Sequence, residues 1–513
     1  MKIRLIAIVV SCSVVILSIV WLVSPSFEVV GECSQIAREP NISPDYCGIV
    51  TPSNIAPLNF RILEKGQAYC VKIHSDSGPT IEIASKTGRI RIPLRRWRAM
   101  LDANKGRELF VDVYVRNAES EWLQFQRIVN RIADEDIDRT VVYRFMKPVY
   151  NGWKDMGIYQ RDLTDFDVSL VMHGRSFGEG CLNCHSFVGN TSETMTIGLR
   201  SKKYGSSTLL ARNGDVVKIG AKWGYTAWHP SGRLAVYSIN KVRQFFHAGG
   251  MEVRDVVDLD SALLCYHLDS KNVTCPDGLA DKNRLETYPT WSPDGRYLYF
   301  CSGPILWKDR NTVPPENYDK LKYDLRRIAY DPGTDQWGEV ETVLSADETG
   351  LSILLPRISP DGRFLLFCMC RYGCFPIYQP SSDLYLMDLT TGDYRRLAVN
   401  SSYSESWHSW SANSRWIAFS SRRQGGALTR TYLSYVDRTG QVHKPFVLPQ
   451  KDPAYYDSLI ETFSVPELIA DSVKVSKSLL ARVARSEPSV TVDIPITGAT
   501  PQVGRSEPWP ERE

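Results

Sequence analysis

The stretch Tyr288-Pro-Thr-Trp-Ser-Pro-Asp-Gly-Arg-Tyr-Leu-Tyr-Phe-Cys301 recurs along the chain and decides the predicted fold. Related copies begin at Tyr225, Pro356 and Ser406, and the last of these is degenerate. In each copy a turn of the Ser-Pro-Asp-Gly type joins two apolar segments, which is the pattern of two strands and a tight turn. Repetition of such strand pairs predicts a β-propeller. The copies lie farther apart than the ~40–45 residues of a plain blade, so we expect inserted loops.

A second motif, Cys181-Leu-Asn-Cys-His185, has the C-x-x-C-H spacing at which haem c is attached. On a helix the thiols of Cys181 and Cys184 would share one face and bond the two haem vinyl groups, while His185 would be the proximal iron ligand. The alternatives are a redox disulfide and half of a zinc site. No second cysteine pair stands at zinc-ribbon spacing, and nothing around Cys181 has a β-α-β pattern. The motif therefore predicts one covalent haem c.

The distal haem ligand is the residue that would separate electron transfer from catalysis. Met195 is the first candidate, because a His/Met pair raises the potential as in electron-carrying cytochromes. His247 is the second candidate, and an open iron position is the third. His229 and His408 stand beside the blade motifs, where a structural role between blades is the better interpretation.

The N-terminus carries Lys2 and Arg4, followed by an apolar run from Leu5 to Val23 that is long enough to cross a bilayer. The positive residues should stay inside, which predicts a single-pass inner-membrane protein with the bulk of the chain in the periplasm. An uncleaved anchor is favoured over a cleaved signal peptide. The 61 basic and 58 acidic residues give a net charge of +3, so no nucleic-acid partner is indicated.

The chain of 513 residues is expected to hold several domains in a mainly β protein. Residues 56–142 alternate with period two and predict a small β-sandwich-like domain, with one short helix over 95–103. Cys265 and Cys275 flank an expected hairpin and could meet as a cross-strand disulfide. The full division is an anchor, a linker, the β-rich domain, a haem c-binding segment, the propeller (six blades or fewer) and a disordered tail, over residues 1–24, 25–55, 56–142, 143–204, 205–466 and 467–513.

The repeats resemble those of the TolB-like propellers, whose blades carry a W-x-P-D-G-R-x-I-x-F pattern. The chain is also similar to a bacterial family of membrane-anchored c-type cytochromes that combine C-x-x-C-H with TolB-like (PD40) repeats. The segments that carry this resemblance are Asn54–Arg61, Met156–Leu163, Cys184–Phe187, His408–Trp416 and Pro445–Pro453. The resemblance implies an exported haem c protein with a propeller, and it supplies no reaction.

Three functions follow from these features. The first is a membrane-anchored mono-haem cytochrome c that passes single electrons to a redox partner, with the propeller as docking platform. The second is a propeller that binds a component of the cell envelope, with a structural or sensory haem. A haem peroxidase-type enzyme comes last, because no distal acid–base residue stands out. Gly174-Arg-Ser-Phe-Gly178 matches a hydrolase nucleophile elbow, but strands follow it where an α/β context is required.

Overall fold

The computed structural model describes residues 31–147, 155–247 and 254–493, except for the side chains of Asn183 and Cys184. The chain divides into two compact units. Of the described residues, the first contains those in the ranges 31–48, 57–131 and 450–455, and the second contains those in the ranges 49–56, 132–449 and 456–493. Among the described residues, no helix is long and apolar enough to span a membrane, and the predicted anchor at 1–24 lies outside them.

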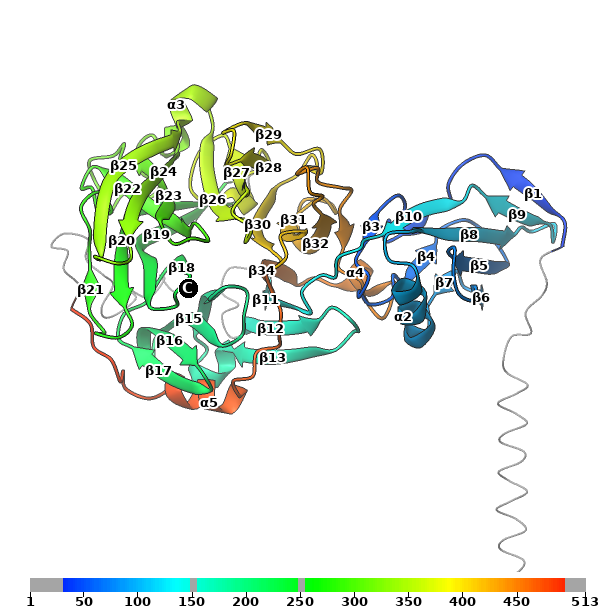
Figure 1. Ribbon diagram of the computed structural model, residues 1–513, viewed down its shortest axis with the longest axis horizontal. Coiled ribbons are helices and arrows are strands. Elements are labelled where there is room, and N and C mark those ends of the chain that lie inside the picture. Colours follow the sequence, from blue (N-terminus) through cyan, green and yellow to red (C-terminus); the bar gives the residue numbers. More distant parts are fainter. Residues whose placement is uncertain (1–30, 148–154, 248–253, 494–513) are drawn as a thin grey trace, which may run out of the picture. The chain divides into compact units, whose positions relative to one another are not determined.

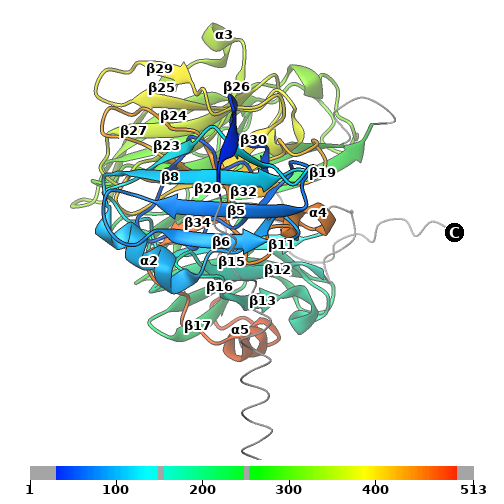
Figure 2. The same cartoon turned by 90° about the vertical axis from the view of Figure 1, so that its right-hand side faces the viewer.

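The first unit is built around a β-sheet in which β8 (Glu108–Arg116) is the longest strand. One edge of β8 pairs with β5, and its other edge pairs with β9 and β10. The paired strands are β1 (Cys33–Ile36), β5 (Ala68–His74), β6 (Ile81–Ser85), β9 (Trp122–Phe125) and β10 (Ile128–Ile132). Figure 2 shows β5, β6 and β8 lying side by side.

A smaller three-stranded sheet and one helix complete this unit. The small sheet contains β2 (Ile42–Ser43), β4 (Phe60–Ile62) and β7 (Arg89–Ile90). Helix α2 (Leu94–Ala103) confirms the helix predicted over 95–103. It buries Trp97, Met100 and Leu101, which share one face because they are three and four residues apart. The unit is therefore mainly β, as predicted, although its chain segments differ from the predicted 56–142.

The second unit is a β-propeller, because its described residues form six four-stranded antiparallel sheets that follow one another around a ring (Figure 1). Blade 1 contains β11 (Thr140–Met146), β12 (Gly157–Asp162), β13 (Val168–His173) and β34 (Thr462–Ile469). Blade 2 contains β14 (Cys181–Phe187), β15 (Thr194–Ser201), β16 (Gly205–Arg212) and β17 (Asp215–Ile219). Blade 3 contains β18 (Thr226–Trp228), β19 (Leu234–Phe246), β20 (Arg254–His267) and β21 (Val273–Thr274).

Blade 4 contains β22 (Arg284–Trp291), β23 (Tyr297–Pro304), β24 (Asp324–Asp331) and β25 (Gln336–Leu344). Blade 5 contains β26 (Ser352–Ile358), β27 (Phe364–Cys370), β28 (Asp383–Asp388) and β29 (Tyr394–Arg396). Blade 6 contains β30 (Glu405–Trp410), β31 (Trp416–Ser421), β32 (Arg430–Tyr435) and β33 (Phe446–Val447). The ring is closed within blade 1, where β34 from the C-terminal part of the chain pairs with β11.

The predicted Ser-Pro-Asp-Gly turns link neighbouring blades as well as neighbouring strands. The Nε2 atom of His229, in the blade 3 turn, lies 3.2 Å from the backbone oxygen of Gly295 in the blade 4 turn. Asp361 and Ser414, in the turns of blades 5 and 6, are joined by a backbone-to-hydroxyl hydrogen bond of 2.9 Å. The contact with Gly295 confirms a structural role for His229 between blades.

Three boundaries predicted from the sequence are wrong. The propeller begins at Thr140 rather than at residue 205, since the segment 143–204 supplies strands of blades 1 and 2 instead of a separate haem domain. The predicted disordered tail contains the end of β34 and helix α5 (Lys477–Ala484). The C-terminal end of α5 is held by Lys218, whose Nζ donates to the backbone oxygens of Ala484 (3.0 Å) and Ser486 (2.7 Å).

The expected disulfide in blade 3 is not formed. Cys265 lies opposite Thr274 rather than opposite Cys275, so the two sulfur atoms do not occupy a directly paired position. Cys265 and Cys275 are therefore both free thiols.

Candidate functional site

The C-x-x-C-H motif lies on β14, the first strand of blade 2, and not on a helix as expected. The pairing of β14 with β15 shifts between Asn183 and His185, which is a β-bulge. The first strands of blades 4, 5 and 6 have the same shift, with Tyr288, Leu355 and Trp407 in the left-handed backbone region. The motif therefore occupies a structural position that the blade repeat creates elsewhere in the ring.

His185 and His408 occupy equivalent places in two blades, because Cys184-His-Ser-Phe and Trp407-His-Ser-Trp both lie at the bulge of the first strand of their blade. Both histidines line a cavity on the propeller axis. His185 is only 2% exposed, and its Nε2 atom has no hydrogen-bond partner. Burial, reinforced by the positive charge of Arg144, lowers the pKa of His185 to about 3, so its imidazole is neutral at physiological pH.

His408 is the equivalent histidine of blade 6. Its Nε2 atom lies 3.0 Å from the backbone oxygen of Leu366, and burial lowers its pKa to about 3. Next to the two histidines, Arg357 forms an ion pair with Glu467, the pKa of which is raised by burial. His408 thus joins parts of the ring, as expected of a structural histidine.

Haem does not fit the residues around His185 as they are folded. The axial cavity measures about 40 Å³, close to the ~30 Å³ occupied by one water molecule. Ligand pockets of the size needed for a cofactor are about 300–1,000 Å³. The side chain of Cys181 is buried in an apolar cluster with Leu182, Phe177 and Met195. The donor chemistry suits haem, since His185 is neutral and its Nε2 is unpartnered, but the space does not.

The two candidate distal ligands lie in different places. Met195, on β15, lies directly opposite Phe187, so their side chains project from the same face of the sheet. His185 is two residues before Phe187 on β14 and therefore projects from that face as well. Side chains that project in one direction from adjacent strands cannot approach an iron from opposite sides, so this fold does not make Met195 and His185 an axial pair. His247 directly follows β19 and lines a separate, larger pocket.

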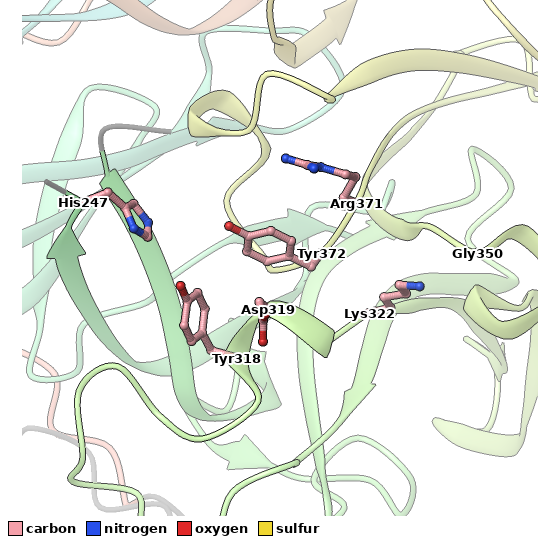
Figure 3. Close-up of a pocket in the computed structure, with 7 residues that line it drawn as sticks. All are labelled: His247, Tyr318, Asp319, Lys322, Gly350, Arg371 and Tyr372. Carbon is pink, nitrogen blue, oxygen red and sulfur yellow. The ribbon is translucent and has the colours of Figure 1, made fainter. Parts of the chain in front are cut away.

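This larger pocket, which we call the face pocket, has a volume of about 560 Å³ (Figure 3). It is lined by the described residues His247, Tyr318, Asp319, Lys322, Gly350, Arg371 and Tyr372. His247 comes from the link between the second and third strands of blade 3. The corresponding links of blades 4 and 5 supply Tyr318 and Tyr372. Strands alternate in direction, so these three links meet on one face of the propeller.

Asp255, on β20, organises the aromatic side of the face pocket. Asp255 is 5% exposed, and its carboxylate accepts hydrogen bonds from the hydroxyl of Tyr372 (2.9 Å) and from Nε2 of Gln379 (2.7 Å). The Nε2 atom of His247 lies 2.9 Å from the same carboxylate. One buried carboxylate therefore ties blade 3 to blade 5 and fixes the imidazole, which leaves Nδ1 as the ring nitrogen that can meet a ligand.

Of the residues that line the face pocket, the sequence singles out His247, but as a candidate distal haem ligand. Asp255, Tyr318 and Tyr372 belong to no motif, and they come from links of three blades that are far apart in sequence. No local pattern could have revealed them. Among the described residues, no group of three histidine, cysteine, aspartate or glutamate side chains could hold a metal ion.

No family model matches this chain. The chain is 27% identical over 158 residues to the uncharacterized protein Atu1656 of Agrobacterium fabrum; the match covers 27% of this chain and spans about half (51%) of that protein.

Solved structures similar to this chain include β-propellers. TolB from Acinetobacter baumannii is similar with a TM-score of 0.42 at 13% identity, over 74% of this chain and 85% of TolB. An oligogalacturonate lyase from Vibrio parahaemolyticus is similar with a TM-score of 0.32 at 13% identity, over 74% of this chain and all of the lyase (100%). The propeller assignment rests on the six sheets themselves.

Proposed function

We propose that this protein is a propeller binding module whose ligand site is the face pocket. The observation that carries the proposal is the convergence of polar side chains from blades 3, 4 and 5 on one cavity of about 560 Å³. Cavities of this size with a few fixed polar groups are where proteins bind small molecules. In this proposal the N-terminal apolar run tethers the chain to the inner membrane, and the propeller meets its ligand on the periplasmic side.

Preorganisation supports this assignment. The carboxylate of Asp255 holds His247 and Tyr372 in place before any ligand arrives. A ligand then loses less free energy to ordering the site, because the side chains that contact it have already lost their rotational freedom. Phe245 packs edge-on against both His247 and Tyr318, with ring centroids 5.4 Å and 4.9 Å apart, and so restricts the movement of both rings.

The test is calorimetric titration of the full chain with a defined panel of sorbitol, glucose, gluconate, inorganic phosphate and glucosamine. At least one member should bind, and Asp255→Asn should weaken that binding about tenfold, since an amide cannot accept from all three partners. Tyr372→Phe should weaken it severalfold. The matched control is Tyr394→Phe on β29, outside the pocket, which should leave affinity unchanged. Failure of every panel member to bind, or equal effects of Tyr372→Phe and Tyr394→Phe, would reject the proposal.

Haem attachment at Cys181 and Cys184 is a second candidate function, in which the protein passes single electrons to a redox partner. The observation that favours it is the neutral, buried imidazole of His185, whose Nε2 has no partner. An axial haem ligand needs such a nitrogen. Since the axial cavity is close to the size of one water molecule, haem would require β14 to adopt another conformation.

This second function predicts haem staining on a denaturing gel after export from cells that mature c-type cytochromes. Staining should be lost entirely in Cys181→Ala with Cys184→Ala, because both thioether bonds are then impossible. The matched control is Cys368→Ala with Cys370→Ala, another closely spaced pair of cysteines, which should keep the stain. An unstained wild-type protein, or a stained Cys181/Cys184 variant, would exclude covalent haem at this motif.

A further inference from the structure

The charges at the face pocket are balanced. Its lining residues carry two cations, Lys322 and Arg371, and one carboxylate, that of Asp319. A second carboxylate, that of Asp255, lies behind the wall, 2.9 Å from Nε2 of His247. Asp255 is buried, so water and salt screen its charge only weakly. Two positive and two negative charges leave no excess of either sign, which favours a ligand without net charge.

Four polar side-chain groups of the lining have no hydrogen-bond or ion-pair partner within the described part of the chain. They are the hydroxyl of Tyr318, the carboxylate of Asp319, the ammonium of Lys322 and Nδ1 of His247. The carboxylate accepts hydrogen bonds, and so does Nδ1 of the neutral imidazole when Nε2 donates to Asp255. The ammonium donates, and the phenol can do both. A ligand rich in hydroxyls matches this mixture, because each hydroxyl donates and accepts.

A charged ligand would be repelled by part of the same set of groups. An anion would face the carboxylates of Asp319 and Asp255, whereas a cation would face Lys322 and Arg371. A neutral molecule meets neither repulsion and can still form hydrogen bonds with the charged groups, which are stronger than those between neutral partners.

Two aromatic rings give the pocket an apolar wall. Tyr318 and Tyr372 pack edge to face, with ring centroids 6.0 Å apart and an interplanar angle of 77°. In Figure 3 the hydroxyl of Tyr318 points towards His247, so polar and apolar surfaces lie next to each other. A sugar has the same division, because its hydroxyls project from a ring that also presents CH groups. Tyrosine suits such a ligand, since it combines an apolar ring with a polar tip.

We infer that the face pocket binds a neutral sugar. The sugar's hydroxyls donate to Asp319 and His247 and accept from Lys322. Its CH groups pack against the rings of Tyr318 and Tyr372. This inference rests on the proposed function, because it names the ligand class of that same pocket.

Glucose, glucuronate and glucosamine provide a sharp test, because they share one ring and differ in charge. Titration of the full chain should show glucose binding at least fivefold tighter than either charged sugar, with an affinity that salt hardly changes. Asp319→Asn and Lys322→Gln should each weaken glucose binding about fivefold, since each replaces a charged hydrogen-bonding group by a neutral one. Glucuronate should gain on glucosamine in Asp319→Asn and lose to it in Lys322→Gln, because the pocket then carries a net charge.

The matched control is Lys320→Gln. Lys320 is an exposed cation in the same short helix as Tyr318 and Asp319, but it does not line the pocket, so glucose affinity should change less than twofold. Methyl glucoside binding as tightly as glucose would support the inference with a sugar unit of a glycan as the ligand, and weaker binding would support it with a free sugar.

Three results would overturn the inference while leaving a binding module. They are a charged sugar or phosphate binding as tightly as glucose, equal effects of Lys322→Gln and Lys320→Gln on glucose affinity, and an unaltered charge preference in Asp319→Asn. Absence of binding by the whole panel would instead remove the proposed function itself.

Discussion

Removal of residues 462–513 is expected to abolish cooperative folding of the propeller, although the deleted segment lies more than 300 residues from its pairing partner. The deletion removes β34, which pairs with β11 along its length and completes blade 1. Phe463 packs against Tyr143 and Phe145, with ring centroids 4.8 Å and 5.1 Å apart. Without β34, β11 becomes an open edge strand on the axis of the ring, where unpaired backbone groups favour aggregation.

The free energy lost in this deletion can be estimated from the side chains that β34 buries. Phe463, Val465, Leu468 and Ile469 are buried. At about 1.5–3 kcal/mol each, their burial is comparable with the ~5–15 kcal/mol net stability of a typical protein. The strand also links other blades, because Asn190 of blade 2 donates to the backbone oxygen of Leu468 at 2.9 Å. The free energy lost with these contacts is comparable with the whole net stability, so we expect that the remaining ring does not fold cooperatively.

The measurement is the cooperativity of thermal and urea unfolding, followed by near-ultraviolet circular dichroism. Two shorter deletions serve as controls. Removal of 494–513 takes away only residues beyond the described part and should leave the transition unchanged. Removal of 476–513 takes away α5 but keeps β34, and should lower the midpoint while preserving a single transition. A cooperative transition in the 462–513 deletion would show that the ring does not need its closing strand.

Glu286→Gln is expected to stabilise the protein by about 2–3 kcal/mol at pH 8 and to lose this advantage by pH 4.5. Glu286 lies on β22 and is 1% exposed. Its Oε1 accepts a hydrogen bond from the hydroxyl of Ser302 (3.0 Å), and its Oε2 has no partner. Burial raises the pKa of this carboxyl to about 8, against the hydrogen bond from Ser302, which lowers it.

The stabilisation by Glu286→Gln grows with pH because protonation of this carboxyl is linked to folding. The folded pKa of Glu286 lies above the unfolded value of 4.5, so the group's favourable contribution is present below pH 4.5 and is lost as the pH rises towards 8. Over that window the folded chain must keep a proton that the unfolded chain releases. Each pH unit costs about 1.4 kcal/mol, and a neutral amide avoids this cost. Part of the gain is offset because the amide NH₂ replaces an oxygen and needs acceptors of its own.

Urea unfolding at a series of pH values should therefore give a difference between variant and wild type that grows with pH. The matched control is Glu339→Gln, which removes an exposed carboxylate from β25 of the same blade and should change stability by less than 0.5 kcal/mol at every pH. A difference that stays constant between pH 4.5 and pH 8 would show that Glu286 is ionised in the folded protein.

Both expected effects depend on contacts between distant parts of the chain, and they show which parts of the protein the sequence could predict. The turn of Ser292–Gly295 and its relatives carry local information, because a tight turn between apolar segments leaves few alternatives to paired strands. Three further copies reveal a propeller by repetition. Helix α2 was predictable for a similar reason, since three buried residues recur at helical spacing.

Blades 1 and 2 escaped prediction because their strands lack this repeated turn. Blade 1 takes three strands from 140–173 and the fourth from 462–469, so no continuous segment contains its pattern. In blade 2 the C-x-x-C-H spacing suggested a helix around haem. The inner-strand bulge shared with blade 6 reveals instead that His185 corresponds to His408. A comparison of Cys184-His-Ser-Phe with Trp407-His-Ser-Trp contained this information in a degenerate form.

The sequence by itself determined the repeated strand pairs, the positions of their turns and the mainly β class, because hydrophobic alternation and turn chemistry act between near neighbours. Tertiary structure alone decided the number of blades, the closing strand and the face pocket, because each depends on residues that meet only when the ring closes. Asp255 illustrates the difference. It is one aspartate among many in the sequence, and only folding brings His247, Tyr372 and Gln379 to its carboxylate.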